Sequence, residues 1–214
     1  MISVVTVHGL WMPGVSMAVL ARRLAPRGFR VVAFEYPSVR GSLADNAAAL
    51  ADFIERVPGE VVHVVAHSLG GVVTRAMLER GPVRRLRRVV CLGSPLRGSV
   101  TAARLARLPG GPALVGRSLA EINARGGFDE WPAAAEVGSI AGNWSLGFGL
   151  MLGPLPRPND GTVAVAETNL PGLADHIVLP VSHMALVWSS AVAAQVQHFL
   201  EHGRFRREGR ELER

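Results

Sequence analysis

Three residues with the chemistry of a nucleophilic catalyst occur in this chain in a suggestive order. Ser68 lies within residues 66–71 (AHSLGG), Asp160 lies within the turn sequence NDG at 159–161, and His183 follows later in the chain. A serine hydroxyl becomes a strong nucleophile when a histidine accepts its proton and a carboxylate holds that histidine in the correct tautomer. The order Ser, Asp, His therefore predicts a catalytic triad of Ser68, Asp160 and His183.

The residues around Ser68 predict a sharp turn between a strand and a helix. The β-branched run 61–66 has the composition of a buried strand, and apolar residues recur at helical spacing over 72–77. Gly70 and Gly71 remove the Cβ atoms that would clash where the helix returns against the strand. Such a turn lifts the hydroxyl out of the sheet and points the N–H groups of the first helical turn beside it. A serine in a turn of small residues is also typical of an ordinary helix N-cap, so this motif alone does not distinguish a nucleophile from a cap.

Other residues are weaker candidates for the same roles. Asp175 and Glu167 are alternative acids, but Asp175 precedes the strand that leads to His183 and is expected at the opposite end of the sheet. His67 is expected to pack beside the nucleophile, and His8 to brace the loop after the first strand. Ser94 has the reach to hydrogen-bond near the site. The remaining histidines are expected to be structural or exposed: His63, His176, His198 and His202.

The order of predicted elements gives the fold class. Strands are expected at 2–7, 29–34, 61–66 and 86–92, alternating with helices at 15–26 and 43–57, the second capped by Ser42, and with the helix after Ser68. Short connections in a β-α-β pattern predict a mostly parallel sheet with helices on both faces. In such sheets, sites form at the carboxyl ends of the strands, which is where this order places Ser68.

The second half of the chain has a less regular pattern. Two short helices are expected at about 100–108 and 117–125, strands at 136–141 and 176–179, and a last helix at 184–202. Without a repeat or linker, residues 1–203 are expected to form one domain in which about 99–158 is an insertion that contacts substrate. A charged tail, expected to be solvated, follows at 204–214.

Residues 143–156 are apolar but interrupted by glycine and proline, so neither a good helix nor a good strand is expected there. An apolar loop of this kind serves as an acyl-binding wall or a mobile lid, or it simply packs over the sheet edge. Trp144 and Phe148 are its candidate substrate-binding residues.

Composition limits the classes of protein to consider. A chain of 214 residues buries enough surface to fold without disulfides or metals, and the single Cys91 lies in an apolar run. No Cys-x-x-Cys spacing occurs, so no metal site is expected. The sequence opens on its first strand and has no long apolar run, so we expect a cytoplasmic protein without a transmembrane segment.

The net charge of +6 raises the question of an anionic partner. All 23 basic residues are arginine, which is typical of a GC-rich coding bias, and those near the C-terminus alternate with glutamate. We therefore expect no nucleic-acid partner. Transient contact with an anionic membrane surface stays open.

Four motifs in order make the chain resemble the α/β-hydrolase family, and within it the compact bacterial lipases and the esterases related to the inositol-deacylase domain. They are VHGL at 7–10, AHSLGG at 66–71, GSPLRGS at 93–99, and NDGTV at 159–163 followed by His183. The third departs from the family's frequent Thr-Pro-His, since Leu96 stands where the histidine would be.

The resemblance implies an α/β-hydrolase fold and assigns further roles. The backbone N–H groups of Leu10 and Leu69 would form an oxyanion hole, and Trp11 and Met12 would lie at the mouth of the site.

These observations lead us to expect a serine hydrolase that cleaves small-molecule or lipid esters through an acyl-enzyme, without a cofactor. Small or medium acyl groups are favoured over emulsified fat. Two alternatives remain at this point. One is a catalytically idle hydrolase fold that serves as a binding protein, and the other is an acyltransferase or thioesterase that uses the same triad.

Overall fold

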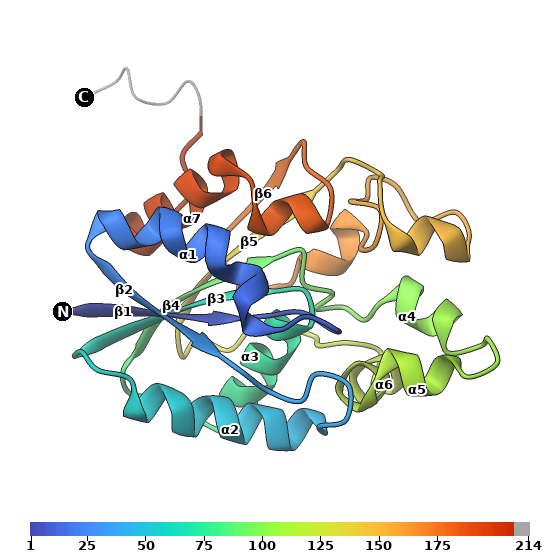
Figure 1. Ribbon diagram of the computed structural model, residues 1–214, viewed down its shortest axis with the longest axis horizontal. Helices are drawn as coiled ribbons and strands as arrows, with labels where there is room; N and C mark the ends of the chain where they lie inside the picture. Colours follow the sequence, from blue (N-terminus) through green and yellow to red (C-terminus); the bar gives the residue numbers. More distant parts are fainter. Residues whose placement is uncertain (208–214) are drawn as a thin grey trace.

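The computed structural model describes residues 1–207, and within this range the backbone forms one six-stranded sheet with helices on both faces (Figure 1). The strands follow the spatial order β2-β1-β3-β4-β5-β6, and every neighbouring pair is parallel. The predicted parallel sheet is confirmed. Its strands are β1 (Ile2–Val7), β2 (Phe29–Phe34), β3 (Val61–His67), β4 (Leu86–Leu92), β5 (Glu136–Gly142) and β6 (Asp175–Leu179).

Two pairs of helices enclose the sheet. Helices α2 (Leu43–Arg56) and α3 (Leu69–Glu79) cover one face, and α1 (Ala18–Leu24) and α7 (Ser190–His202) cover the other (Figure 1). Each face has its own cluster of buried apolar side chains. The sheet is therefore the middle layer of three, and its four inner strands are buried over most of their length.

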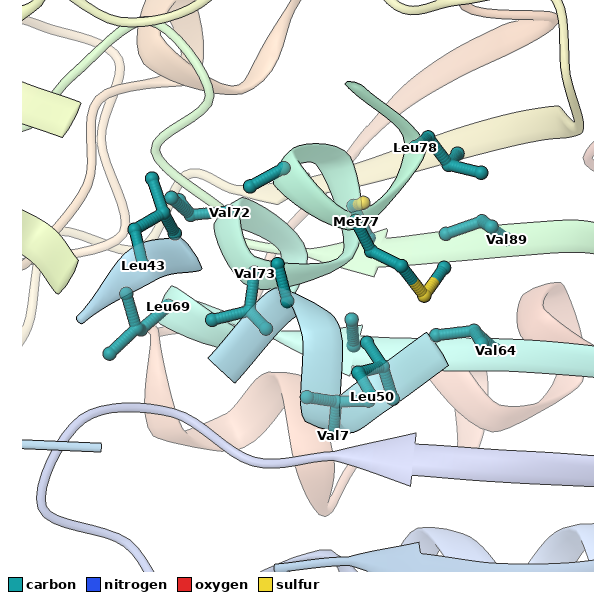
Figure 2. Packing of buried hydrophobic residues seen from close by; sticks show 14 of the residues in the cluster. Val7, Leu43, Leu50, Val64, Leu69, Val72, Val73, Met77, Leu78 and Val89 are labelled. Atoms are coloured by element: carbon teal, nitrogen blue, oxygen red, sulfur yellow. The ribbon is translucent and has the colours of Figure 1, made fainter. Parts of the chain in front are cut away.

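The buried strands supply side chains to both clusters because successive side chains along a strand point to opposite faces. Val64 belongs to the cluster with α2 and α3, whereas Val65 belongs to the cluster with α1 and α7, and both are fully buried. Figure 2 shows Leu50, Val73 and Met77 gathered in the first cluster. This burial on both sides explains why β3 is a run of β-branched residues without polar alternation.

Capping residues decide where several helices begin. The predicted cap of α2 is confirmed, since the Ser42 hydroxyl accepts the N–H of Asp45 at 3.1 Å. The last helix was predicted to begin at 184, but Met184–Val187 forms a separate 3₁₀ turn, η5. Helix α7 begins only at Ser190 because the Ser189 hydroxyl accepts the N–H of Val192 and caps it there.

The first helical stretch is also divided. A 3₁₀ turn, η1 (Gly14–Met17), precedes α1, and a second, η2 (Ala25–Arg27), follows it. Pro26 in η2 has no N–H to continue the α-helical bonding pattern. Gly28 then ends the stretch with a φ of 86°.

The segment between β4 and β5 lies beyond the carboxyl ends of the strands (Figure 1). It holds α4 (Val100–Leu105), α5 (Gly111–Val115) and α6 (Arg117–Ala124). Helix α5 was not predicted, because its Gly-Gly-Pro start resembles a turn, although proline fits the first turn of a helix. The apolar segment 143–156 contains only a 3₁₀ turn, η3 (Phe148–Leu152), and a further one, η4 (Val165–Thr168), precedes β6.

The start of the expected tail packs on α7 through one residue. Phe205 is buried, its ring centroid lies 4.8 Å from that of Phe199 in α7, and the N–H of Arg206 donates to the Gln195 side chain. The side chains of Arg204, Arg206 and Arg207 are exposed, so the charged groups of this segment contact water while its aromatic residue anchors it. The rest of the predicted tail, 208–214, lies outside the described residues.

We expect the buried His63 in β3 to make stability depend on pH. Its side chain is 2% exposed, and burial, followed by the charges of Arg88 and Arg87, lowers its pKa to about 4. Between pH 6.5 and 4 the unfolded chain binds a proton at this histidine that the folded chain does not. The free energy of unfolding should therefore decrease as the pH is lowered through this range, by up to about 1.4 kcal/mol per pH unit from this group.

Urea unfolding at pH 7, 5.5 and 4.5 would test this by comparing wild type with His63→Leu, whose slope should be smaller. His202→Gln, at an exposed position, is the matched control and should keep the wild-type slope. Equal slopes for wild type and His63→Leu would contradict the prediction.

Candidate active site

Ser68 lies at a strained backbone position between β3 and α3. Its φ of 52° and ψ of −121° make it one of two non-glycine residues with positive φ within residues 1–207, the other being Trp11. A residue with a Cβ adopts this conformation at a cost of about 1–3 kcal/mol and keeps it only where the surrounding structure enforces it. Here a buried strand and a buried helix fix the two sides of the turn, and the serine lines a cavity at the carboxyl edge of the sheet.

The turn is possible because α3 approaches its neighbouring strands very closely. A Cβ on Gly70 would overlap the carbonyl oxygen of Val7 and lie 2.8 Å from that of His8. A Cβ on Gly71 would overlap the side chain of Ser94. The two glycines therefore let the start of α3 pack against the ends of β1 and β4.

An acid and a base meet at the same edge of the sheet. Nδ1 of His183 lies 2.7 Å from Oδ2 of Asp160. Because an ionised carboxylate can only accept, we assign the imidazole proton to Nδ1, which leaves Nε2 able to accept one. Asp160 is 1% exposed, and its other oxygen accepts the N–H groups of Thr162 at 2.9 Å and Val163 at 2.7 Å. These bonds hold the carboxylate in one orientation behind the imidazole.

Backbone and side-chain hydrogen bonds join the loops that carry this pair. The N–H of His183 donates to the carbonyl oxygen of Asp160 at 2.9 Å. Beside it, the side-chain oxygen of Asn159 accepts the hydroxyl of Ser145 at 2.7 Å and the N–H of Gly161 at 3.0 Å. The position of the acid is thus set by its own turn and by the segment 143–156 that packs on that turn.

Gly93, directly after β4, is a site residue whose role the sequence analysis missed. It has a φ of 56°, and a Cβ there would lie 3.1 Å from both Asp160 Oδ2 and His183 Nδ1. The acid and the base therefore pack directly on this backbone. A glycine after a strand was the only signal available, and it does not distinguish a simple turn from such a close approach.

Ser68 and His183 line the same cavity, although no hydrogen bond joins them within residues 1–207. Catalytic hydrogen bonds are often long before substrate binds and tighten in the complex. The ring of His67 packs beside that of His183, with centroids 4.8 Å apart, and its Nε2 lies 3.2 Å from the His183 carbonyl oxygen. Burial, followed by the charge of His183, lowers the pKa of His67 to about 3, so His67 is neutral and serves as a packing residue.

The two proposed oxyanion donors flank the serine. Leu69 is the first residue of α3, so its N–H has no partner inside the helix. Leu10 follows Gly9, where a Cβ would lie 3.1 Å from Ser68 Cβ and 3.1 Å from His67 Nδ1. The loop after β1 therefore lies directly against the serine turn.

His8 braces this loop, as predicted. Its ring stacks on Tyr36 with centroids 4.4 Å apart, and the Tyr36 hydroxyl donates to the His8 carbonyl oxygen at 2.8 Å. Burial raises the pKa of Tyr36, which keeps the phenol protonated and able to donate. The segment before the first oxyanion donor is thus fixed from the side of β2.

A cavity of about 280 Å³ opens beside Ser68 and His183. Most of its wall is apolar, and it is bounded by the loop after β1, by α4–α6 and by the 143–156 segment. The lining residues include Leu10, Trp11, Met12, Pro95, Ala102, Leu105, Val115, Leu119, Leu146, Phe148, Val163 and Met184. Four of these come from the short helices α4–α6, whose apolar faces were the only sequence signal for them.

The structure brings together most of the predicted substrate contacts. Trp11, Met12 and Phe148 line the cavity, and the Trp11 and Phe148 rings meet edge to face with centroids 5.8 Å apart. Trp144 does not line it. That side chain is 61% exposed, and the backbone N–H of Trp144 donates to the carbonyl oxygen of Val181, which fixes the residue outside the cavity wall.

The alternative acids lie elsewhere. Asp175 begins β6 at the opposite end of the sheet, where it accepts the N–H of Phe205. Glu167 accepts the N–H groups of Val100 and Ala164, and burial raises its pKa. Neither carboxylate contacts His183.

Within the described residues, no cluster of three or more histidine, cysteine, aspartate or glutamate side chains has the arrangement of a metal site. Over the same range, no helix has the length and apolar character needed to cross a bilayer.

Solved structures with this fold include several ester hydrolases. The mature lipase BlEst2 from Bacillus licheniformis is 20% identical, with a TM-score of 0.74 over 93% of this chain and 90% of that one. The metagenomic carboxyl esterase MGS0156 is 21% identical, with a TM-score of 0.67 over 86% of this chain and 65% of that one. The carboxylesterase CesB from Bacillus subtilis is 14% identical, with a TM-score of 0.61 over 92% and 83%. At these identities, the likeness shows the fold alone.

No curated protein sequence matches this chain. A family model does, and it is described as the alpha/beta hydrolase family. The match covers residues 4–210, which includes most of β1, the other five strands and the segments that carry Ser68, Asp160 and His183. It confirms the resemblance drawn from the four sequence motifs and the fold class inferred with it. The chain belongs to the alpha/beta hydrolase family.

Proposed function

We propose that this protein is a serine hydrolase that cleaves carboxylic esters through an acyl-enzyme intermediate. The observation that carries the proposal is the buried Asp160–His183 pair, which opens onto the same cavity as the strained Ser68 turn. Members of the same fold named as a lipase and as carboxyl esterases give it further support.

In this mechanism Nε2 of His183 accepts the proton of the Ser68 hydroxyl as Oγ attacks the ester carbonyl carbon. The carbonyl oxygen becomes an oxyanion, which the N–H groups of Leu10 and Leu69 stabilise. His183 then gives the proton to the leaving alcohol, and the acyl group stays on Ser68. A water molecule activated by the same histidine releases the carboxylic acid and restores the serine.

Asp160 has two tasks in this cycle. Its hydrogen bond to Nδ1 keeps Nε2 unprotonated before the attack, and its charge stabilises the imidazolium that forms during it. The two N–H donors on its other oxygen keep it from rotating away. The proposal therefore needs no metal and no organic cofactor.

Replacing the nucleophile tests the proposal most directly. Ser68→Ala should lower kcat for a short p-nitrophenyl ester by about 10⁶, because the triad acts as a unit. A fluorophosphonate probe should label wild type and fail to label the variant. Ser94→Ala, which removes the same atom from a buried serine after the neighbouring strand, is the matched control and should retain activity and labelling. Substantial turnover by Ser68→Ala would refute the assignment, and an unlabelled, inactive wild type would favour an idle hydrolase fold.

A second test addresses the acid. Asp160→Asn should keep the fold but lower kcat by about 10⁴, because the amide N–H₂ facing Nδ1 favours the tautomer with the proton on Nε2. Asp175→Asn, at the other end of the sheet, is the control and should retain wild-type kcat. The measurement is steady-state hydrolysis of the same ester at pH 8, with circular dichroism to show that both variants are folded. Equal activity of the two variants would rule out Asp160 as the acid.

A further inference from the structure

The cavity beside Ser68 has two ends that differ in exposure. At one end, Ala102 and Leu105 of α4, Val115 of α5 and Leu119 of α6 are all buried. At the other end, Leu146 is 72% exposed, and Trp11, Phe148 and Met184 are also exposed. The cavity is thus a pocket with a closed apolar end beneath the short helices and an open apolar mouth.

No charged carboxylate or guanidinium belongs to the residues that line this pocket in the described chain. Two of the hydroxyls on the lining residues have partners: that of Ser99 accepts the N–H of Ala102, and that of Thr101 donates to the carbonyl oxygen of Thr162. A charged group placed at the closed end would lose its hydration without meeting an opposite charge, which is unfavourable. The closed end therefore suits an uncharged aliphatic chain.

The wall of the closed end is fixed in place at the start of α4. The Asn123 side chain in α6 accepts the N–H of Ser99 at 2.7 Å and donates to its carbonyl oxygen at 3.0 Å. Glu167 accepts the N–H of Val100 at 2.7 Å. Because α4 is tied to α6 and to the segment after Asp160, the pocket has a defined depth.

The volume of the whole cavity, with its open mouth included, sets an upper limit on the length of chain that can fit. A protein cavity of about 150 Å³ holds benzene, with its six carbons, so in proportion about 280 Å³ holds roughly eleven non-hydrogen atoms. About three of these belong to the ester group itself, which leaves room for an acyl chain of roughly eight carbons.

We propose that the closed end is an acyl pocket for unbranched aliphatic chains of up to about eight carbons, with its length limit set by Val115 and Leu119. The proposal rests on the function proposed above and adds the substrate class. Longer chains would have to leave the pocket, because α5 and α6 close it.

A series of p-nitrophenyl esters tests the size limit. For wild type, kcat/KM should rise from acetate through butyrate to octanoate and then fall at least about tenfold by hexadecanoate, since even one methylene that an apolar pocket cannot hold changes discrimination by about tenfold. A kcat/KM that is flat or still rising at hexadecanoate would overturn the proposal.

Two substitutions test which residues set the limit. Ala102→Leu adds three carbons inside the pocket and should lower the octanoate-to-butyrate ratio of kcat/KM by about tenfold or more. Leu119→Ala removes three carbons and should raise the dodecanoate-to-octanoate ratio by about tenfold. The matched control is Leu108→Ala, at a 48% exposed position just beyond α4 that does not line the pocket, and it should keep both wild-type ratios.

The outcomes separate this proposal from the one it rests on. Ester hydrolysis with unchanged ratios in Leu119→Ala would overturn the acyl pocket and leave the serine hydrolase intact. Absence of ester hydrolysis and of fluorophosphonate labelling in wild type would overturn both. The chain-length ratios of wild type and Leu119→Ala test the acyl pocket even if Ala102→Leu does not fold.

Discussion

The close packing of α3 on the ends of β1 and β4 is the constraint on which the rest of the site depends. It forces the chain to reverse at Ser68 with a positive φ, a cost of about 1–3 kcal/mol. Burying a single valine or leucine stabilises the fold by about 1.5–3 kcal/mol, and β3 and α3 together bury many such side chains. The strain is therefore easily sustained. Only glycine at 70 and 71 permits this approach, since any Cβ there would overlap a neighbouring strand or side chain.

The order of the strands explains how the three proposed catalytic residues meet. Ser68 follows β3, whereas Asp160 and His183 follow β5 and β6, so β4 lies between the serine and both of them. Strands are about 4.8 Å apart, and β6 is three positions away from β3, so the loop that carries the base must reach back roughly 14 Å across the ends of β5 and β4. Gly93 stands at that crossing and has no side chain to block it. The absence of a Cβ at Gly93 is therefore needed for Asp160 and His183 to pack at this position.

The sequence could predict the parts of the molecule that a local pattern determines. The strands, the turn at Ser68 and the cap at Ser42 each follow from a few neighbouring residues, and the structure contains them. The exposure of Trp144 and the pocket wall follow from contacts between distant segments. Whether an apolar residue in a Gly-rich loop faces a cavity or water depends on backbone bonds such as that from Trp144 to Val181, which no periodicity encodes.

The serine turn and the pocket wall share one hydrophobic core. Ala102, Leu105, Val115 and Leu119 belong to the same buried cluster as the side chains of α2 and α3 that support the turn at Ser68. Hydrogen bonds from Asn123 and Glu167 add to this packing at the start of α4, and each contributes about 0.5–1.5 kcal/mol, or somewhat more where a carboxylate accepts. A substitution in the wall therefore changes the volume of the pocket and also the packing of the core that supports the serine. Under the proposed function, the size of the substrate and the position of the nucleophile are coupled through this cluster.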